Sequence, residues 1–269
     1  MSAFAEATAV RAAGGSSYAV SVDPAWSIAG VPNGGYLMAL LIRAALDAAG
    51  VPDPLAVSAH FTRPPSFGPA EIQVERVKSG RQTSALRASL WQADSVRLDT
   101  LITAGTLPDH DAGVGWNDHP MPTIPPPEDC APNDRGPFQV ALLDMVEERL
   151  DPATVPFERT SDGGVTTAPG GEPVLRGWLR LADGTDPDPL FVALAVDAMP
   201  PTVFNLGHFG WAPTVELTVL LRGRPAPGWL LCESRTHYLA GGWFDEECTA
   251  WDSTGRVVAQ SRQLALLGR

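Results

Sequence analysis

The chain carries one sequence pattern twice. Residues 61–92 and 221–252 each contain an Arg-Pro pair near the start, a Gly a few positions on, a Gly where a hairpin would turn and a Trp near the end. The offset between the copies is about 160 residues, as these pairs show: Arg63 with Arg224, Pro64 with Pro225, Gly68 with Gly228, Gly80 with Gly241 or Gly242, and Trp91 with Trp251. Two long copies indicate a tandem duplication, because a solenoid needs three or more short repeats. The halves of a duplicated fold can diverge, so one can keep chemistry that the other has lost.

The composition is that of a compact globular protein. Its 269 residues are 44% hydrophobic and 19% charged, which is enough for two units that each have a core. Residues 1–15 lack the basic start and apolar run of a secretory signal, and no run reaches the ~18 apolar residues of a membrane span. The net charge of -12 disfavours nucleic acid, which binds basic surfaces. We expect a cytoplasmic protein with no membrane or nucleic-acid partner.

The sequence contains no motif for a metal or a cofactor. Three cysteines form no Cys-x-x-Cys pair and are expected to be reduced: Cys130, Cys232 and Cys248. The five histidines have neither HExxH nor HxH spacing: His60, His110, His119, His208 and His237. P-loop and GxGxxG strings are also absent. We therefore expect neither a metal nor a cofactor.

A proline-rich stretch separates the two copies. Prolines fix backbone angles and remove hydrogen-bond donors, so the segment from Leu107 to Pro137 is expected to hold no regular helix or sheet. We predict an N-terminal unit over 1–107, a linker over 108–137 and a C-terminal unit over 138–269. A second irregular stretch, Thr160 to Pro173, is expected to be a long, mobile surface loop.

Both halves show an apolar helix followed by strands. The predicted helices are Tyr36–Ala49 and Pro189–Met199; the first is apolar nearly all round, so it must be wrapped on most sides. The predicted strands of the first half are Ser17–Val22, Leu55–Thr62, Glu71–Lys78, Thr83–Gln92 and Val96–Thr106. Those of the second half are Met145–Leu150, Val174–Leu181, Val215–Arg222, Leu230–Leu239, Glu246–Asp252 and Val257–Leu267. This order predicts an α+β double hotdog, in which a curled antiparallel sheet wraps one buried helix, twice.

A set of short motifs in these elements resembles a known family. The set comprises Asn33-Gly34-Gly35-Tyr36, His60-Phe61-Thr62-Arg63-Pro64, Gly80-Arg81, Asp197, Thr214 and Gln263. In this order and spacing they resemble the TesB-like (type II) double-hotdog acyl-CoA thioesterases over essentially the whole chain. The resemblance implies hydrolysis of an acyl-CoA to the free acid and CoA. It also implies that Asp197, Thr214 and Gln263 position a water that attacks the thioester directly, with no covalent acyl-enzyme.

The start of the first helix is a candidate oxyanion site. Backbone amides at a helix N-terminus are unpaired and favour negative charge, and Gly34 and Gly35 have no side chains to block approach. Tyr36 follows them and is included among the candidate substrate-binding residues. The alternative is that the two glycines only make a tight turn and permit close packing.

Asp197 is the sharpest candidate for chemistry. It is the only ionisable residue in the segment Pro189–Met199, where an unpaired buried charge would cost several kcal/mol. Partial burial would raise its pKa towards that of a general base. The alternative is a carboxylate hydrogen-bonded for structural reasons near the end of the helix.

Gln263 and Thr214 are candidates from strand alternation. Gln263 shares one face of its strand with Val257, Ala259, Ser261, Ala265 and Leu267, so it is a polar residue on a largely inward face. An amide can accept from a water and donate to a carboxylate. Thr214 shares its face with Glu216 and Thr218, so a solvated strand face is the alternative for that residue.

The first half lacks this polar set. Leu41 and Ile42 lie near the position of Asp197, Asp53 and Pro54 lie opposite Thr214, and Thr103 lies opposite Gln263. Conversely, the second helix begins Asp188-Pro189-Leu190, without the two glycines. We predict one composite site per chain, with oxyanion donors from the first half and the three polar side chains from the second.

The residues that would bind the CoA phosphates and the acyl group are less clearly indicated by the sequence. Arg81 and Arg63, with Arg43, are candidates for the CoA phosphates, although each is better explained as an ordinary surface arginine. Trp26 and the segment Phe204–Trp211 either border an acyl pocket or belong to the core.

Other functions fit the sequence less well than hydrolysis. A serine hydrolase would need Gly-x-Ser-x-Gly, which is absent. A hotdog enoyl-CoA hydratase or dehydratase pairs a carboxylate with a His, and the first His after Asp197 is His208. A non-catalytic acyl-CoA-binding protein is the alternative outside the enzymes. Hotdog sheets commonly pair, so we expect a homodimer or a dimer of dimers.

Overall fold

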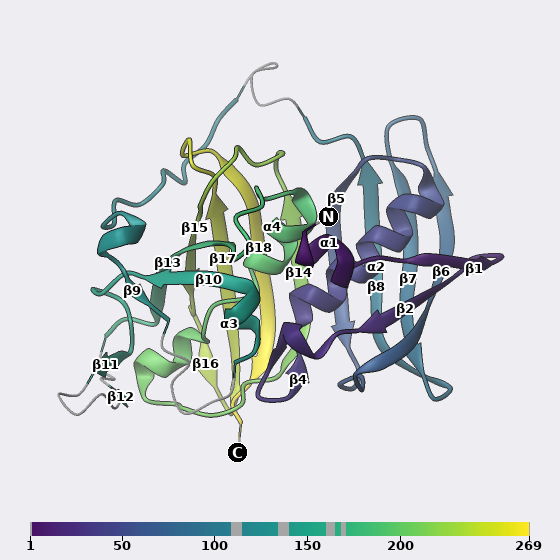
Figure 1. Cartoon of the computed structure of the whole chain (residues 1–269). Coiled ribbons are helices and arrows are strands. Elements are labelled where there is room, and N and C mark those ends of the chain that lie inside the picture. Colours follow the sequence, from purple (N-terminus) through teal and green to yellow (C-terminus); the bar gives the residue numbers. More distant parts are fainter. Residues whose placement is uncertain (1, 109–114, 134–139, 160–164, 168–170, 269) are drawn as a thin grey trace.

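Most strands of the chain join one antiparallel sheet that curls around two helices (Figure 1). The computed structural model describes residues 2–108, 115–133, 140–159, 165–167 and 171–268. The strand order is β1-β2-β6-β7-β8-β5-β14-β18-β17-β15-β13-β10-β9. The first half supplies β1 (Arg11–Gly14), β2 (Ser17–Val22), β5 (Asp53–Phe61), β6 (Gly68–Ser79), β7 (Ser84–Gln92) and β8 (Ser95–Gly105). The second half supplies β10 (Val146–Leu150), β13 (Val174–Leu181), β14 (Thr214–Leu221), β15 (Leu230–Arg235), β17 (Trp243–Trp251) and β18 (Val257–Leu266).

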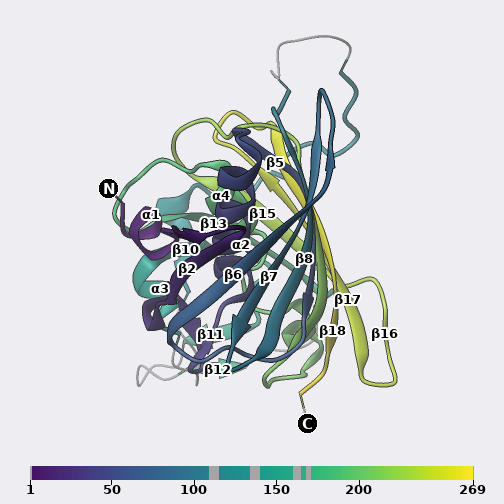
Figure 2. The same ribbon diagram turned by 90° about the vertical axis from the view of Figure 1, so that its right-hand side faces the viewer.

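The two halves meet where β5 pairs with β14. The register of this seam runs from His60 opposite Glu216 to Ala56 opposite Leu220. It makes one continuous sheet out of two curled ones. The strands β6, β7 and β8 wrap around the helix of the first half (Figure 2).

That helix, α2 (Gly34–Ala49), begins and ends at residues suited to those positions. Asn33 is the N-cap and accepts a hydrogen bond from the Tyr36 N–H, while Gly50 ends the helix in the left-handed conformation with φ 67°. Ten of its residues are buried, because strands lie against most of its surface. The expected wrapping of an all-round apolar helix is confirmed.

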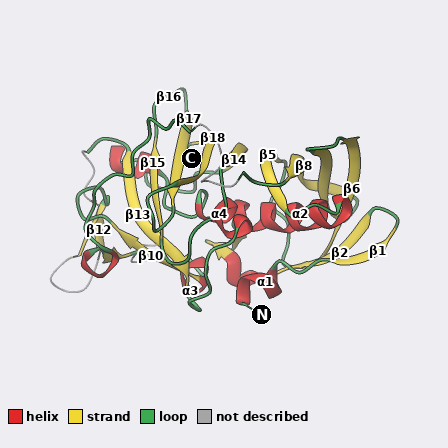
Figure 3. Cartoon of the chain, turned by 90° about the horizontal axis from the view of Figure 1, so that it is seen from above, coloured by secondary structure: helices red, strands yellow, loops and turns green. Residues whose placement is uncertain are grey.

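The helix of the second half, α4 (Pro189–Ala195), is shorter than predicted. The prediction of a helix to Met199 was wrong because Pro200 and Pro201 follow. A proline ring collides with the carbonyl four residues earlier, here those of Val196 and Asp197, and it disfavours helical backbone at the preceding residue. Asp197 therefore lies in a turn just beyond α4 rather than within the helix. Figure 3 shows α4 and α2 in one row on the inner side of the sheet.

Three other predicted segments need correction. The strand Leu230–Leu239 ends at Arg235, because the carboxylate of Asp245 accepts from the amides of His237 and Tyr238, and β16 (Leu239–Ala240) follows. Within the predicted loop Thr160–Pro173, residues 165–167 form β12 (Val165–Thr167), paired with β11 (Phe157–Arg159); residues 160–164 and 168–170 lie outside the described residues. The proline-rich segment also contains a short helix, η2 (Pro127–Asp129), and β9 (Ala131–Pro132), which pairs at the sheet edge with β10, where proline is tolerated.

The duplication is visible in the irregularities of the sheet. Pairing of β5 with β8 shifts between Pro54 and Ala56, and pairing of β14 with β18 shifts between Thr214 and Glu216. Pairing of β7 with β8 shifts between Leu90 and Trp91, and pairing of β17 with β18 shifts between Ala250 and Trp251. Both bulges recur at an offset of about 160 residues, the offset seen in the sequence. They therefore align the two halves residue by residue.

The N-terminus crosses from the first half to the second. The short helix α1 (Ala3–Ala7) donates the Ala3 N–H to the Asp183 carboxylate at 3.0 Å, and the ring of Phe4 meets that of Phe191 edge-on at 5.9 Å. The predicted boundaries of the two units stay a prediction. The remaining short elements are η1 (Pro24–Trp26), β3 (Ser27–Ile28), β4 (Val31–Pro32), α3 (Leu142–Met145) and η3 (Thr202–Leu206). No helix in the described part of the chain has both the length and the apolar character needed to cross a membrane.

Candidate active site

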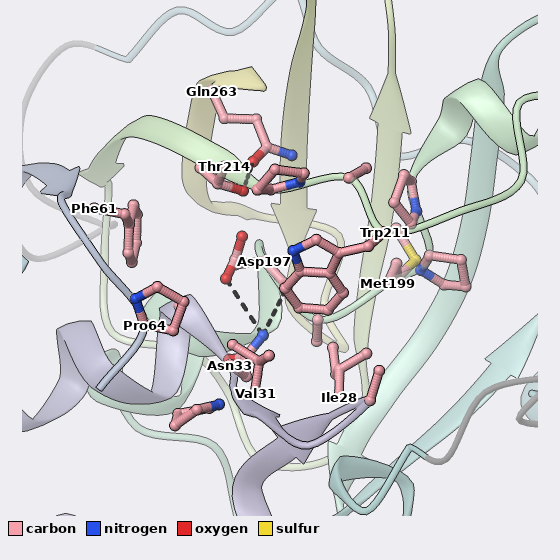
Figure 4. A pocket seen from close by; sticks show the side chains of 18 of the residues that line it. Ile28, Val31, Asn33, Phe61, Pro64, Asp197, Met199, Trp211, Thr214 and Gln263 are labelled. Carbon is pink, nitrogen blue, oxygen red and sulfur yellow. Dashed lines mark hydrogen bonds between the residues drawn. The ribbon is translucent and has the colours of Figure 1, made fainter. Parts of the chain in front are cut away.

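A cavity of about 350 Å³ lies where the end of α4 meets the start of α2 (Figure 4). Its lining from the first half includes Asn33, Gly34, Phe61 and Arg63, and from the second half Asp197, Thr214, Glu246 and Gln263. Apolar side chains fill much of the remaining wall, among them Ile28, Val31, Met199 and Trp211. The cavity thus combines an apolar wall with a few convergent polar groups, as ligand sites do.

Asp197 is held by the start of α2. Its Oδ2 accepts from the Gly35 N–H at 2.7 Å and from Asn33 Nδ2 at 3.3 Å, and its backbone carbonyl accepts from Asn33 Nδ2 at 2.9 Å. Among the described residues, its other oxygen, Oδ1, has no protein partner. The carboxylate lies between Asn33 on one side and the Thr214–Gln263 pair on the other (Figure 4). One oxygen is fixed, and the other is left for a ligand.

Burial raises the pKa of the Asp197 carboxyl from 3.8 to about 7. The Gly35 N–H bond opposes this rise, the negative charge of Glu246 adds to it, and the Asn33 amide opposes it. A carboxyl that titrates near neutral pH is suited to accept a proton from a weak acid such as water. The pKa of the Asp197 side chain is therefore suited to a general base.

The two glycines have different roles. A Cβ on Gly35 would lie 2.7 Å from the Cα of Leu194, so this glycine lets the two helices touch, while its amide is committed to Asp197. A Cβ on Gly34 would lie 2.8 Å from Asp197 Oδ2 and 2.9 Å from the ring of Phe61. The Gly34 N–H has no acceptor among the described residues. Of the two amides expected to face an oxyanion, only that of Gly34 is free, and close packing also explains the glycine pair.

A bulge turns Thr214 towards the cavity. Thr214 stands opposite Ala265, an inward residue of β18, whereas Glu216 stands opposite Leu264, which is exposed. The extra residue between them, Val215, breaks the alternation that would have put Thr214 on the face of Glu216 and Thr218. The alternative of a solvated strand face for Thr214 is therefore wrong.

Gln263 links Thr214 to a buried carboxylate. Thr214 Oγ1 donates to Gln263 Oε1 at 2.5 Å, and Gln263 Nε2 donates to Glu246 Oε1 at 3.0 Å. Glu246 was not among the predicted residues. Alternation offered a signal, since Glu246 shares the inner face of β17 with Phe244, Cys248 and Ala250. Asn33 was quoted only as part of a motif, although an Asn before two glycines is an N-cap signal.

The other predicted residues are divided between the cavity and elsewhere. Arg63, Phe204 and Trp211 line it. The Tyr36 side chain lies in the core instead: its ring stacks on Trp26 at 5.7 Å, its hydroxyl donates to the Ala7 carbonyl, and burial raises its pKa to about 12. Trp26 likewise belongs to the core.

Two of the candidate arginines lie outside the cavity wall. Arg81 is exposed in the turn between β6 and β7, and Arg43 donates to the hydroxyl of Thr8; neither is among the described residues that line the cavity. In the described part of the chain, no three His, Cys, Asp or Glu residues cluster so as to hold a metal ion.

Comparison with known proteins identifies the family of both halves. Residues 22–106 match the acyl-CoA thioesterase N-terminal domain, and residues 127–267 match the acyl-CoA thioesterase C-terminal domain. An uncharacterized protein of Mycobacterium tuberculosis is 32% identical over 264 residues, which cover 90% of this chain and 88% of the other.

Solved structures share the fold. That of a candidate thioesterase II from Thermobifida fusca has a TM-score of 0.87 and 39% identity, and the match covers 100% of this chain and 98% of the other. That of acyl-CoA thioesterase II TesB2 from Mycobacterium marinum has a TM-score of 0.72 over 99% and 98% of the two chains; its identity of 20% shows the fold alone. The chain has the double hotdog fold and belongs to the TesB-like acyl-CoA thioesterase family.

Proposed function

We propose that the protein hydrolyses an acyl-CoA to the free acid and CoA by direct attack of a water held by Asp197, Thr214 and Gln263. The observation that carries this proposal is the junction of the two helices. There, Asp197 with one free carboxylate oxygen and Gly34 with a free first-turn amide line the same cavity. A thioester carbonyl between them would meet a base on one side and an oxyanion donor on the other.

Asp197 acts as the general base. Its fixed Oδ2 holds the carboxylate in place, and Oδ1 accepts the proton of the water as the oxygen attacks the carbonyl carbon. Protonation of Asp197 removes a negative charge from the start of α2 at the moment when the oxyanion forms. The Gly34 N–H and the positive end of the helix then stabilise that new charge. Collapse of the tetrahedral intermediate breaks the C–S bond and leaves the free acid. The departing CoA thiolate takes the proton from Asp197, which restores the ionised carboxylate.

The two ends of the substrate require different surroundings. The acyl group contacts the apolar wall near Met199 and Trp211, and the phosphates of CoA bind near Arg63 at the edge of the cavity. A hydratase or dehydratase would need a histidine beside the carboxylate. None lies among the described residues that line the cavity, and His208 is exposed.

A panel of acyl-CoAs with a thiol-detecting assay tests the proposal. We expect CoA release by the wild type with at least one acyl class, and a kcat at least ~10²-fold lower for Asp197→Asn, which keeps the size of the side chain and removes the base. The matched control is Asp94→Asn at an exposed turn, which should keep the wild-type rate. Equal rates for Asp197→Asn and wild type would exclude Asp197 as the base, and binding without release by the wild type would favour a non-catalytic acyl-CoA-binding protein.

A further inference from the structure

We propose that Glu246 is a positioning residue that fixes the direction of the hydrogen bonds running through Gln263 to Thr214, and thereby turns the acceptor side of the Thr214 hydroxyl towards the attacking water. This inference rests on the proposed hydrolysis at the same cavity. It adds a fourth side chain to the three that the family resemblance names.

Among the described residues, the Glu246 carboxylate acts only as a hydrogen-bond acceptor. Its Oε2 accepts from the N–H and the hydroxyl of Thr202, both at 2.7 Å, and its Oε1 accepts from Gln263 Nε2 at 3.0 Å. Glu246 is only 8% exposed, and Thr202 is fully buried. Three donors aimed at two oxygens suit an ionised carboxylate.

The ionised Glu246 carboxylate fixes the orientation of the Gln263 amide. An ionised carboxylate can only accept, so the NH₂ group of Gln263 points to Glu246 and its carbonyl oxygen points to Thr214. Thr214 must then donate its hydroxyl proton to Gln263. The lone pairs of Thr214 Oγ1 are left to accept from a third group, and Thr214 lines the cavity.

This direction matters for the water. A water that donates one O–H to Asp197 Oδ1 and the other to Thr214 has a lone pair left for the thioester carbon. With the chain of bonds reversed, the Thr214 proton would point at the water and occupy one of its two lone pairs, and the second O–H of the water would lose its acceptor. The direction of the chain therefore determines whether the water is oriented for attack.

The first half shows that packing does not require this carboxylate. Glu246 pairs across the strands with Gln263, and the bulges align this pair with Leu86 and Ile102, which pair with each other and are fully buried. An apolar pair fills the same place in the same curled sheet. Burial of a carboxylate is costly, and burial raises the pKa of Glu246. The bonds from Thr202 give Glu246 a structural role, but the bond to Gln263 is one that the packing of the first half does without.

Glu246→Gln tests the inference because it reverses the chain without a change in volume. The introduced amide keeps a carbonyl for Thr202 and turns its NH₂ to Gln263, which must then flip and donate to Thr214. We expect kcat to fall on the order of 10- to 100-fold with KM within about 3-fold of the wild type. The control is Glu247→Gln on the same strand, whose side chain faces outward and pairs with His237; it should keep the wild-type kcat.

A double variant tests the direction itself. In Glu246→Gln with Gln263→Glu, the amide donates to a new carboxylate, which again accepts from Thr214. We expect the kcat of the double variant to be at least tenfold higher than that of Glu246→Gln. A wild-type kcat for Glu246→Gln, a loss that merely follows the folded fraction measured by thermal unfolding, or no recovery in the double variant would each overturn the inference.

A readout without turnover separates this inference from the proposed function. With glutamine side chains labelled with ¹⁵N, the NH₂ signals of Gln263 should move in Glu246→Gln and stay in Glu247→Gln. If the wild type releases no CoA from any acyl-CoA, the proposed function fails, and shifted Gln263 signals still support the hydrogen-bond direction. Unshifted signals in Glu246→Gln would exclude that direction whatever the activity.

Discussion

The two halves of the sheet fill equivalent places with opposite chemistry. The first half has Pro54, Leu86 and Ile102 at positions where the second half has Thr214, Glu246 and Gln263. The bulges are the same in both, so the backbone does not dictate the difference. Apolar side chains suffice to build this part of the fold, and the polar set of the second half is therefore best explained by what happens in the cavity beside it.

The N-terminal caps of the two helices differ in a similar way, since among the described residues only the cap of α2 is hydrogen-bonded to the other half. At the start of α4, Asp188 caps the helix by accepting from the Phe191 N–H at 2.8 Å, and Pro189 occupies the first turn. At the start of α2, Asn33 caps the helix and also holds Asp197 from the other half. The first arrangement is complete within its own half, whereas the second is completed across the boundary.

The strongest way to break this comparison is to give the second half the pair found in the first. In Glu246→Leu with Gln263→Ile, we expect a folded protein with CoA release reduced more than ~10²-fold, because Thr214 loses its partner. The donors of Thr202 lose their acceptor, at a cost of about 1–3 kcal/mol. Circular dichroism and the thiol assay measure both effects. The control Leu86→Ile with Ile102→Leu should keep full activity, and a double variant with wild-type turnover would refute the comparison.

A methyl group at the helix junction should be costlier than one at the other end of α2. Gly35→Ala pushes a Cβ against the backbone of Leu194, and overpacking of this kind costs about 1–3 kcal/mol or more. Gly50→Ala meets open space, so its cost is the left-handed backbone alone, ~1 kcal/mol. Urea unfolding gives both values, and equal losses would mean that the helices do not meet as described.

The pH dependence of turnover should follow Asp197. Because the base must be ionised, kcat/KM should fall tenfold per pH unit below about 7, the pKa to which burial raises this carboxyl. The folded state favours the protonated acid, so its contribution to stability is fully present below pH ~4 and is lost as pH rises towards 7.

Thermal unfolding of Asp197→Asn tests the same sign. The variant should exceed the wild type at pH 8 by a few °C, roughly 2–4 °C per kcal/mol, with no difference near pH 4. If the variant were less stable than the wild type at pH 8, the raised pKa of Asp197 would be contradicted.

The smallest expected effect separates the two arginines. Arg63→Ala should raise KM for acyl-CoA about 2- to 5-fold, more at low salt, because an exposed charge pair contributes up to ~1 kcal/mol. Arg81→Ala should leave KM unchanged, since Arg81 lies outside the cavity wall. A larger effect from Arg81 would place the CoA phosphates elsewhere.

The fold was largely predictable because duplication and periodicity are local signals. The all-round apolar sequence of α2 predicted a wrapped helix, and alternation placed Gln263 on the inner face of β18 correctly. The same reasoning failed for Thr214, because a bulge resets alternation and leaves no mark in a single sequence. It also paired Gln263 with Thr103, whereas the bulges align Gln263 with Ile102.

The site was predictable only in part because its contacts are long-range. That Asp197 would be used was suggested by its isolation among apolar residues. The bond from the Gly35 N–H to Asp197 removes one of the two expected oxyanion donors. It could not be predicted, because it depends on how the two helices pack end to end. Tyr36 shows the same limit, since a residue next to the glycines faces the core and not the ligand.

The seam between β5 and β14 has a consequence for how the protein is made. Its partners are about 160 residues apart, so on the ribosome β5 must wait with an unpaired edge while the second half is synthesised. Open strand edges recruit other chains, and contacts of such long range form late. Folding yield in cells should therefore depend on protection of nascent β5, which places the main aggregation hazard at the centre of the finished sheet and not at its rim.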